Sequence, residues 1–383
     1  MRILFLAPRY PHPALRGDQR RAIELLRALA AVADVRLLTF GDGPPLPFGG
    51  LEVEKVRRGA ASTALANGAR PDPRLPGQVR MYLDRRMHRR VRRHLDEWAP
   101  DVVHANLLRM APYLPPRGGP HRHLDLVDAL SANLARRAAA SGPAQRLPFA
   151  VEAALLERYE RRAVAAADTS TLVAEADRRA HPGLARCAVV PNGVDLEANA
   201  FRSPEDRPPV LVFFGNLGYF PNVEPARYVA EEVLPLVRRE IPAVTLQLVG
   251  ARPAAGIRRL AGLPGVELVG PVERMPDAVH GAAVAVLPMF SGTGMKNKVV
   301  EAMACGTPVV ANATGMEGIE GALPGADHLR GENALEMAEA CVRLLRAPDE
   351  RVRLAAAGRA LVEERYSWAA RAAQLMALYR RSG

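Results

Sequence analysis

The sequence predicts an α/β protein made of two doubly wound domains with a cleft between them. Short apolar runs alternate with longer segments of helical periodicity along the whole chain, which is typical of parallel sheets covered by helices. The apolar runs are rich in Val, Leu and Ile, as expected of strands that are buried on both faces. A chain of 383 residues is also too long for one ordinary hydrophobic core. Two domains therefore account for both the pattern and the length.

In the first domain, predicted over residues 1–200, the helical spacing of Ala22, Leu25, Leu26 and Leu29 indicates a helix over 18–33. Short runs of apolar residues indicate the strands, which we expect over 3–8, 35–40 and 101–105 and around 123–129.

A second series of strands begins after residue 205, and we expect it to form a domain over 205–365. The polar, Pro-rich segment 198–209 that precedes it is typical of an interdomain linker. The chain closes with a predicted helix over 366–381, within a final segment 366–383. The strands of the second series are expected over 209–217, 244–250, 266–270, 284–288 and 308–312.

Composition narrows the possible functions. The net charge of +11 favours an anionic partner, although an excess of arginine in an alanine-rich chain also fits a GC-rich genome. Aromatic residues make up only 5%, which argues against a base-stacking nucleic-acid groove. The sequence has no Asp-x-Asp pair and no Cys/His cluster, so no metal is expected. Three isolated cysteines and no apolar run of membrane-spanning length indicate a cytoplasmic protein.

The stretch SGTGMKNKVVEAMACGTPVV, residues 291–310, combines a Gly-containing loop with the start of a helix. Lys296 and Lys298 oppose the helix dipole there, but a bound phosphate would reverse that penalty, because helix N-termini present unpaired N–H groups. Glu301 follows one turn later and could accept hydrogen bonds from a ribose diol. The pattern therefore suggests a nucleoside diphosphate site, while an amphipathic helix with solvated lysines remains an equal alternative.

The motif that runs from Glu301 through CGTPVV resembles the signature of family 4 glycosyltransferases, retaining enzymes of the GT-B fold. Within that family it looks most similar to sugar transferases of exopolysaccharide systems. The resemblance implies two Rossmann-like domains, with the closing helix crossing back to the first. Further segments resemble the family in the same order along the chain: LAPRYPHPALRGDQRRAIELLRALA at the N-terminus, VVPNGVD (189–195), FFGNLGYFPNVEPARYV (213–229) and YSWAARAAQLMALY (366–379).

The resemblance also implies a donor site for a nucleotide-diphosphate sugar, which would be a co-substrate, with no cofactor and no metal. Lys298 and the helix amides would bind the diphosphate, Glu301 the ribose, and the loop before the helix the sugar. Gly17 in the first domain would approach the donor phosphate; alternatively it forms a turn before a helix capped by Asp18. The expected donor-binding residues are Gly17, Gly215, Asn216, Gly292, Thr293, Gly294, Met295, Lys296, Lys298, Val299 and Glu301.

The chain departs from the family pattern at three places. Thr293 stands eight positions before Glu301, where the family has its first glutamate. Asn216, Tyr219 and Asn222 occupy the loop in which many relatives carry an Arg and a Lys for the diphosphate. The histidine common at the end of an N-terminal strand has no clear counterpart near 123–129.

Two residues of the first domain are candidate catalytic groups facing the cleft. His104 ends a predicted strand and could orient a sugar hydroxyl or assist proton transfer; equally it could be structural. Asp128 could act on the acceptor as a base or as a hydrogen-bond acceptor, or it could cap the helix that follows.

The helix predicted over 82–98 has one narrow apolar stripe and six arginines. It could lie on acidic lipid headgroups, which would place the protein peripherally at the inner face of a membrane. The alternative is a helix packed on its own domain through that stripe, with a solvated basic face.

These observations lead us to expect a retaining glycosyltransferase of hexosyltransferase type. It would move a sugar from a nucleotide-diphosphate donor to a hydroxyl of a saccharide, lipid-linked or natural-product acceptor. Two alternatives remain open. One is a sugar-nucleotide epimerase of the same fold, and the other is a catalytically silent nucleotide-binding partner subunit, which Thr293 keeps in consideration.

Overall fold

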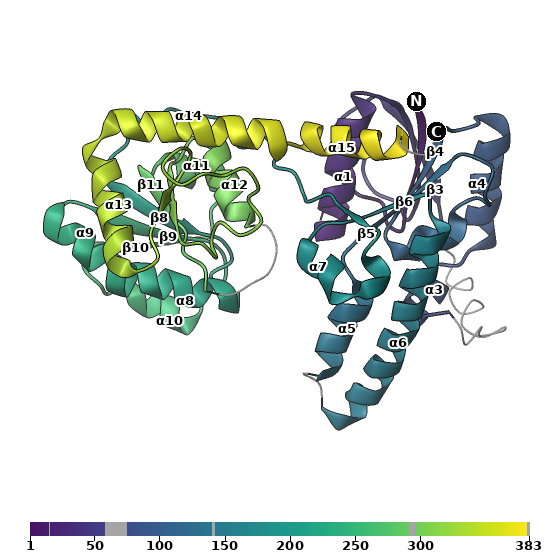
Figure 1. The fold of residues 1–383 in the computed structure, drawn as a ribbon, viewed down its shortest axis with the longest axis horizontal. Helices are drawn as coiled ribbons and strands as arrows, with labels where there is room; N and C mark the ends of the chain where they lie inside the picture. The colour runs from purple at the N-terminus through teal and green to yellow at the C-terminus, as the bar shows by residue number, and fades with distance from the viewer. Residues whose placement is uncertain (15, 58–74, 140–141, 291–295, 381–383) are drawn as a thin grey trace. The chain divides into compact units, whose positions relative to one another are not determined.

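The computed structural model describes residues 1–14, 16–57, 75–139, 142–290 and 296–380. The chain forms two compact units, each a parallel sheet covered by helices (Figure 1). Unit 1 consists of Met1–Asn192 and Arg371–Gly383, and unit 2 of Gly193–Ala370. The chain therefore passes between the units at 192/193 and again at 370/371. The sequence analysis had set these boundaries at 200–205 and 366.

The sheet of unit 1 has seven parallel strands in the order β3-β2-β1-β4-β5-β6-β7. The four strands expected here are confirmed to within two residues. Three more were not predicted, because one alternates charged residues, one reads TSTL and one has only two residues. The strands are β1 (Arg2–Ala7), β2 (Asp34–Phe40), β3 (Leu51–Val56), β4 (Val102–Asn106), β5 (His121–Val127), β6 (Thr169–Leu172) and β7 (Ala188–Val189).

The helices of unit 1 form where apolar residues recur at helical spacing. In α1, Leu25, Leu26 and Leu29 are buried as that spacing predicts. In α4, Asp84 caps the N-terminus by accepting a hydrogen bond from the Arg86 N–H at 2.6 Å. The helices are α1 (Gly17–Ala30), α3 (Gly77–Arg80), α4 (Arg85–Glu97), η1 (Leu108–Tyr113), α5 (Leu130–Ala139), α6 (Pro143–Ala166), α7 (Glu175–Ala180), η2 (Pro182–Leu184) and, from Arg371 onward, α15 (Trp368–Arg380).

The sheet of unit 2 has six parallel strands in the order β10-β9-β8-β11-β12-β13. In both sheets the first strand lies at the centre, with the next two on one side and the following ones on the other. This is the doubly wound order, so the predicted fold class is confirmed. The strands are β8 (Val210–Phe214), β9 (Thr245–Val249), β10 (Val266–Gly270), β11 (Val284–Val286), β12 (Val309–Ala311) and β13 (Leu329–Arg330).

The helices of unit 2 lie on the faces of this sheet (Figure 1). Gly306 follows the end of α12 and terminates it. Gly306 has φ +72° and donates its N–H to the Met303 carbonyl at 3.1 Å, while the Thr307 N–H reaches the Ala302 carbonyl at 2.9 Å. The elements are α8 (Phe220–Tyr228), the π-helix η3 (Val229–Val233), α9 (Leu234–Glu240), α10 (Ala255–Leu260), α11 (Met275–His280), α12 (Asn297–Ala304), α13 (Ala334–Arg346) and α14 (Pro348–Arg365).

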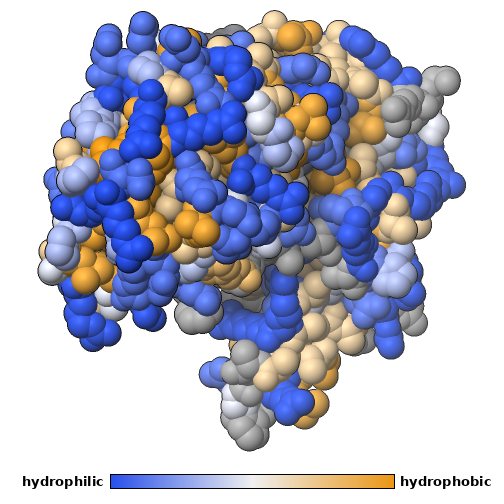
Figure 2. All heavy atoms as spheres, turned by 60° about the vertical axis from the view of Figure 1, so that its left-hand side comes forward, coloured by the Kyte–Doolittle hydropathy of each residue, from blue (hydrophilic) through white to orange (hydrophobic). Residues whose placement is uncertain are grey.

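The central strands carry the cores of both units. Ile3, Leu4, Phe5 and Leu6 of β1 are all fully buried, so both faces of that strand are covered. Each such side chain stabilises the fold by about 1.5–3 kcal/mol relative to an exposed position. Figure 2 shows one outer face, where hydrophilic side chains prevail and hydrophobic ones occur in small groups between them. The strands are thus fixed by burial, and their ends position the polar residues described next.

The two places where the chain passes between units are adjacent on each unit. In unit 2, a Cβ on Gly193 would lie 2.7 Å from Trp368, and the Val194 N–H donates to the Tyr366 carbonyl at 2.7 Å. In unit 1, Gln374 Nε2 donates to the Val189 carbonyl at 3.1 Å. The outgoing and returning segments are therefore tied to each other on both sides of the crossing.

Candidate functional site

The doubly wound order of unit 2 locates its ligand crevice. Ligands of such sheets bind beyond the carboxyl ends of the strands, where the connections diverge to opposite sides. In this sheet the divergence lies between β8 and β11. The loop after β8, the residues after β11 and the start of α12 therefore surround the expected site.

Lys298 of α12 is the central cation of this site. Its Nζ donates to Asn222 Oδ1 at 2.7 Å, and it lies 4.5 Å from the centre of the Phe213 ring and 3.8 Å from Met289 Sδ. Burial lowers the pKa of Lys298 to about 8, against the opposing attraction of Glu301. A partly desolvated ammonium whose contacts are an amide oxygen, a thioether and an aromatic face is well suited to receive an anion.

The loop after β8 depends on two close backbone approaches. Gly215 has φ +137° and Gly250 has φ +151°, and a Cβ on Gly250 would lie only 1.6 Å from the Gly215 carbonyl oxygen. A Cβ on Gly215 would in turn lie 3.3 Å from Asn222 Nδ2. That amide donates to the Asn216 carbonyl at 2.8 Å. Glycine at 215 therefore lets the loop fold back and hold Asn222 against Lys298.

The predicted donor-binding residues at the start of α12 differ in their surroundings. Lys296 is buried, which lowers its pKa, and Glu301 is half-buried. Val299 has a buried side chain, and its N–H donates to the Lys296 carbonyl at 2.9 Å. The side chain of Val299 therefore packs in the core, and its backbone N–H is already hydrogen-bonded within the protein. The predicted residues Gly292, Thr293, Gly294 and Met295 lie outside the described residues.

Asn312, which the sequence analysis did not single out, connects the loops after β11 and β12. Its Oδ1 accepts from the N–H groups of Met289 and Gly315, at 3.0 and 2.8 Å. Its Nδ2 donates to the Met289 carbonyl at 2.9 Å. Asn312 thereby fixes the chain that leads out of β11. An isolated asparagine after a strand gives no sequence signal of such a role.

His104 of unit 1 lies in the interior. It is fully buried, stacked on Phe5 at 4.3 Å between ring centres, and its Nδ1 is 2.7 Å from the hydroxyl of Tyr379 in α15. Burial lowers its pKa to about 4, so the ring is neutral at pH 7. A ring with no exposed surface cannot contact a sugar in this structure. The arrangement corresponds to the structural alternative of the sequence analysis.

Asp128 follows β5 at the carboxyl end of the sheet and is partly exposed. It accepts a hydrogen bond from Asn133 Nδ2 at 3.2 Å. Burial and the nearby charge of Asp177 raise the pKa of Asp128, while Arg109 opposes that shift. Asp128 therefore lies among charged groups at the edge where a doubly wound sheet binds ligands. It remains the candidate acceptor residue of unit 1.

Gly17 is the first residue of α1, and a Cβ built on it would meet nothing within 4 Å. The protein itself therefore imposes no need for glycine at this position. Asp18 does not cap α1 but forms an ion pair with Arg9. The space beside Gly17 is compatible with a close ligand, and the expectation for Gly17 stays a prediction.

Arg21 and Asp125 form a buried ion pair beneath this edge. Arg21 Nε donates to Asp125 Oδ2 at 2.8 Å, and its Nη1 donates to Asn192 Oδ1 at 2.9 Å. Burial alone would raise the pKa of Asp125, but the charge of Arg21 and hydrogen bonds from Arg21 and Thr171 lower it. The network ties α1 and β5 to the last residue of unit 1 before the first crossing.

Two family profiles match the chain. "Glycosyltransferase Family 4" matches residues 15–198, and "Glycosyl transferases group 1" matches residues 208–347. Together they take in most of both units. The chain belongs to the family 4 glycosyltransferases. The suggested association with exopolysaccharide systems is not part of these matches.

Curated relatives are about a third identical to this chain over roughly half of its length. It is 32% identical over 203 residues to the phosphatidyl-myo-inositol mannosyltransferase of Mycobacterium tuberculosis, covering 50% of this chain and 53% of the relative. It is 31% identical over 233 residues to D-inositol 3-phosphate glycosyltransferase 2 of Catenulispora acidiphila, covering 53% and 52%. The chain thus matches about half the length of these curated relatives.

Solved structures share the GT-B fold of this chain. Anabaena HepE in complex with UDP aligns with a TM-score of 0.63 and 17% identity, covering 98% of this chain and 99% of that one. Sucrose-phosphate synthase from Thermosynechococcus elongatus aligns with a TM-score of 0.61 and 21% identity, covering 100% and 99%. Likeness at this level of identity establishes the fold and nothing finer.

The described parts of the chain contain neither a metal-binding cluster nor a membrane-spanning helix. Within those ranges, no three or more His, Cys, Asp or Glu side chains stand together where they could hold a metal ion. None of the helices in the same ranges is long and apolar enough to cross a membrane.

Proposed function

We propose that the protein is a retaining glycosyltransferase that moves a sugar from a nucleotide-diphosphate donor to a hydroxyl of an acceptor. Lys298 is the observation that carries this proposal. It is a partly buried cation at the divergence of a doubly wound sheet, with Asn222 and Phe213 as its neighbours. A diphosphate would place further negative charge beside this partly buried ammonium.

The donor would bind in unit 2 through groups that each match one part of a sugar nucleotide. Lys298 and the first amides of α12 would contact the diphosphate, and Glu301 the ribose hydroxyls. Gly215 and Asn216 leave the backbone after β8 open to close approach. Asn222, in the loop where many relatives carry cations, would orient Lys298 and not replace its charge. Gly17 of unit 1 would leave room for the donor.

Transfer would proceed by front-face attack, as the family resemblance implies. The acceptor oxygen bonds to the anomeric carbon while the bond from that carbon to the phosphate oxygen breaks. The acceptor proton passes to the departing phosphate, so no protein base is consumed. Asp128 would orient the acceptor hydroxyl as a hydrogen-bond acceptor. His104 would act only by supporting β4 from within the sheet.

The acceptor is open to a saccharide, a lipid-linked saccharide or a natural product, and exopolysaccharide synthesis is the setting we favour. The curated relatives named above act on inositol-containing acceptors by their names, one of them a lipid. In α4, Met87 and Val91 are buried on unit 1, as is Trp98 directly after it, while Arg85, Arg89 and Arg92 are exposed. That basic face could rest on anionic headgroups.

A catalytically silent partner subunit is the second candidate. It is favoured by Thr293, which stands where the family has its first glutamate. Such a protein would bind the nucleotide but transfer no sugar with any donor.

The deciding experiment is calorimetric titration with UDP, GDP and dTDP. We expect one of them to bind, and Glu301→Ala to weaken that binding by about 1.5–3 kcal/mol, as for a hydrogen bond to a charged group. Glu339→Ala, at an exposed glutamate of α13, is the matched control and should bind like the wild type. If no diphosphate binds, or if both variants behave alike, the proposed donor site is wrong.

A further inference from the structure

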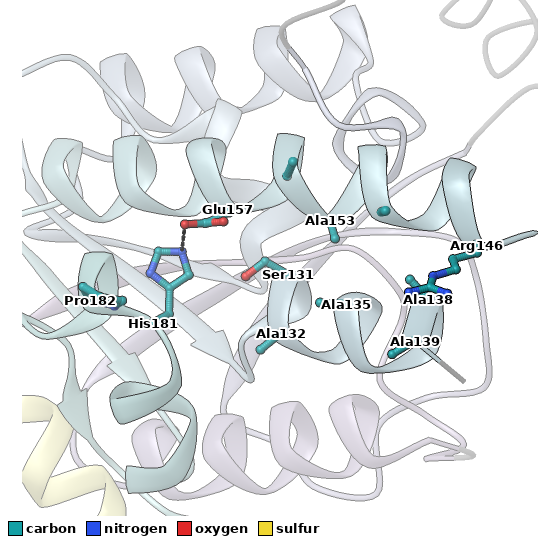
Figure 3. Close-up of a pocket in the computed structure, with 12 residues that line it drawn as sticks. Ser131, Ala132, Ala135, Ala138, Ala139, Arg146, Ala153, Glu157, His181 and Pro182 are labelled. Atoms are coloured by element: carbon teal, nitrogen blue, oxygen red, sulfur yellow. Dashed lines mark ion pairs between the residues drawn. The ribbon is translucent and has the colours of Figure 1, made fainter. Parts of the chain in front are cut away.

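A groove runs between α5 and α6 in unit 1. Its volume is about 480 Å³, within the range of small-molecule sites. Figure 3 shows α5 and α6 on its two sides, with His181 and Pro182 of η2 at one end and Arg146 at the other. The two ends of the groove differ in chemistry.

The inner end holds a buried histidine with an unused nitrogen. His181 is 5% exposed, and its Nδ1 accepts from the Gly183 N–H at 2.9 Å. A neutral ring whose Nδ1 accepts carries its proton on Nε2. In the described chain, Nε2 has no hydrogen-bond partner, although Glu157 Oε1 is 3.8 Å away and Glu160 Oε2 is 4.0 Å away. The ring points toward Glu157 (Figure 3).

The two carboxylates at this end have different surroundings. Glu160 is fully buried and accepts from both the hydroxyl and the N–H of Ser131, at 2.5 and 3.1 Å. The side chain of Glu157 is 55% exposed and lines the groove. A hydroxyl oxygen placed beside both groups would accept from His181 Nε2–H and donate to Glu157. A donor and an acceptor held just beyond direct contact with each other suit an O–H group.

The middle of the groove is lined by methyl groups. Ala132, Ala135 and Ala139 come from α5, and Ala150 and Ala153 from α6. From Ser131 to Ala139 a helix advances about 12 Å. The described lining residues include no Phe, Tyr or Trp, so the walls between the two ends offer no ring for a sugar to stack on. Next to Arg146 along α6, Leu147 is 71% exposed and Val151 is 53% exposed. Between His181 at its inner end and Arg146 at its outer end, the described walls of the groove are thus aliphatic.

We propose that this groove binds an amphiphile with a hydroxylated head and a single aliphatic chain. The head would contact His181 and Glu157, and the chain would lie between the alanines toward Leu147. Ser131 is three residues from Asp128, so the head would lie next to the proposed acceptor position. Identifying this amphiphile as the acceptor rests on the proposed function, whereas binding itself does not.

The test is calorimetric titration of the full chain with octyl glucoside below its micelle-forming concentration, without donor. We expect saturable binding, and at least tenfold weaker binding in Ala135→Leu, which fills the groove from a solvent-facing position. Ala165→Leu adds the same side chain at an exposed position of α6 outside the groove and should bind like the wild type. Glu157→Leu should also weaken binding at least tenfold, because it removes the hydroxyl acceptor.

Three results would overturn the proposal: no binding of octyl glucoside, equal binding by Ala135→Leu and Ala165→Leu, or equally tight binding of glucose alone. The same samples are titrated with the nucleoside diphosphates. Loss of nucleotide binding with octyl glucoside binding intact would remove the proposed donor site and leave the groove. Nucleotide binding without octyl glucoside binding would rule out the groove and leave the proposed donor site.

Discussion

Lys298 shows how burial sets the behaviour of a single residue. Its pKa of about 8 lies within the range in which an enzyme can be assayed, whereas an exposed lysine titrates near 10.5. Below pH 8 most of the ammonium is present and would attract the proposed diphosphate; above pH 8 most of the charge is lost. We therefore expect nucleotide binding to weaken as the pH rises from 7 to 9, measured by calorimetry at constant ionic strength.

The control for this expectation is Lys298→Met, which removes the titrating group. This variant should bind nucleotide weakly at every pH and lose the change between pH 7 and 9. A wild-type affinity that stays constant over this range would show that Lys298 does not bind the diphosphate.

The buried pair of Arg21 and Asp125 makes a prediction about stability. Replacing Arg21 by Met would leave Asp125 buried without its counter-charge. Because removing one partner of such a pair is strongly destabilising, we expect a loss of about 3–5 kcal/mol in the free energy of unfolding of unit 1. Urea denaturation measures this loss.

A double replacement separates the ion pair from simple packing. Arg21→Met combined with Asp125→Leu removes both charges, so it should be less destabilising than Arg21→Met alone. If the double variant loses as much as the sum of the single ones, the ion pair has no special role.

At the scale of elements, α15 covers two buried histidines of the first sheet. Tyr379 of α15 contacts His104 and His123, and burial lowers the pKa of both rings. The unfolded chain takes up protons on these rings below about pH 6.5, but the folded chain keeps them neutral down to about pH 4 for His104. Stability supplied by the neutral rings is thus complete above pH 6.5 and is lost as the pH falls toward 4.

We expect unit 1 to lose stability steeply between pH 6.5 and 4, as measured by urea denaturation at several pH values. Tyr379→Phe should cost about 1–3 kcal/mol at pH 7, because His104 Nδ1 then loses its partner while remaining buried. A His104→Gln variant should show a shallower acid transition. An unchanged acid transition in that variant would contradict this account.

Elements with strong periodicity could be predicted from sequence, and those fixed by their neighbours could not. The strands β1 and β8 contain continuous apolar runs and β2 and β9 are rich in Val and Leu, and both sheets were predicted from such segments. By contrast, β6 reads TSTL, which has no clear strand pattern. Its hydroxyl groups form hydrogen bonds with His123 and Asp125 on β5, and these partners are not visible from the local sequence. The strand β13 has two residues and forms only by pairing with β12.

The same distinction applies to the candidate site. Lys298 and Glu301 could be predicted as site residues because the order of charges at a helix start is a local signal. The contact of Lys298 with Asn222 joins residues 76 positions apart, and no local pattern indicates it. For His104 the sequence left a cleft role and a structural role equally open, because its partner Tyr379 lies 275 positions away and gives no local signal. The sequence indicates which chemistry is present, but long-range contacts determine which groups remain accessible.

For the whole molecule, the main consequence follows from the return of the chain to unit 1 at Arg371. Unit 2 is one continuous stretch, whereas unit 1 is completed by residues that the ribosome adds after all of unit 2. Until then, the sheet face around His104 lacks the cover of Tyr379. Although domains usually fold in order from the N-terminus, unit 2 can here reach its final state before unit 1 does. During synthesis the first 192 residues therefore form the part of the chain that most needs protection from aggregation.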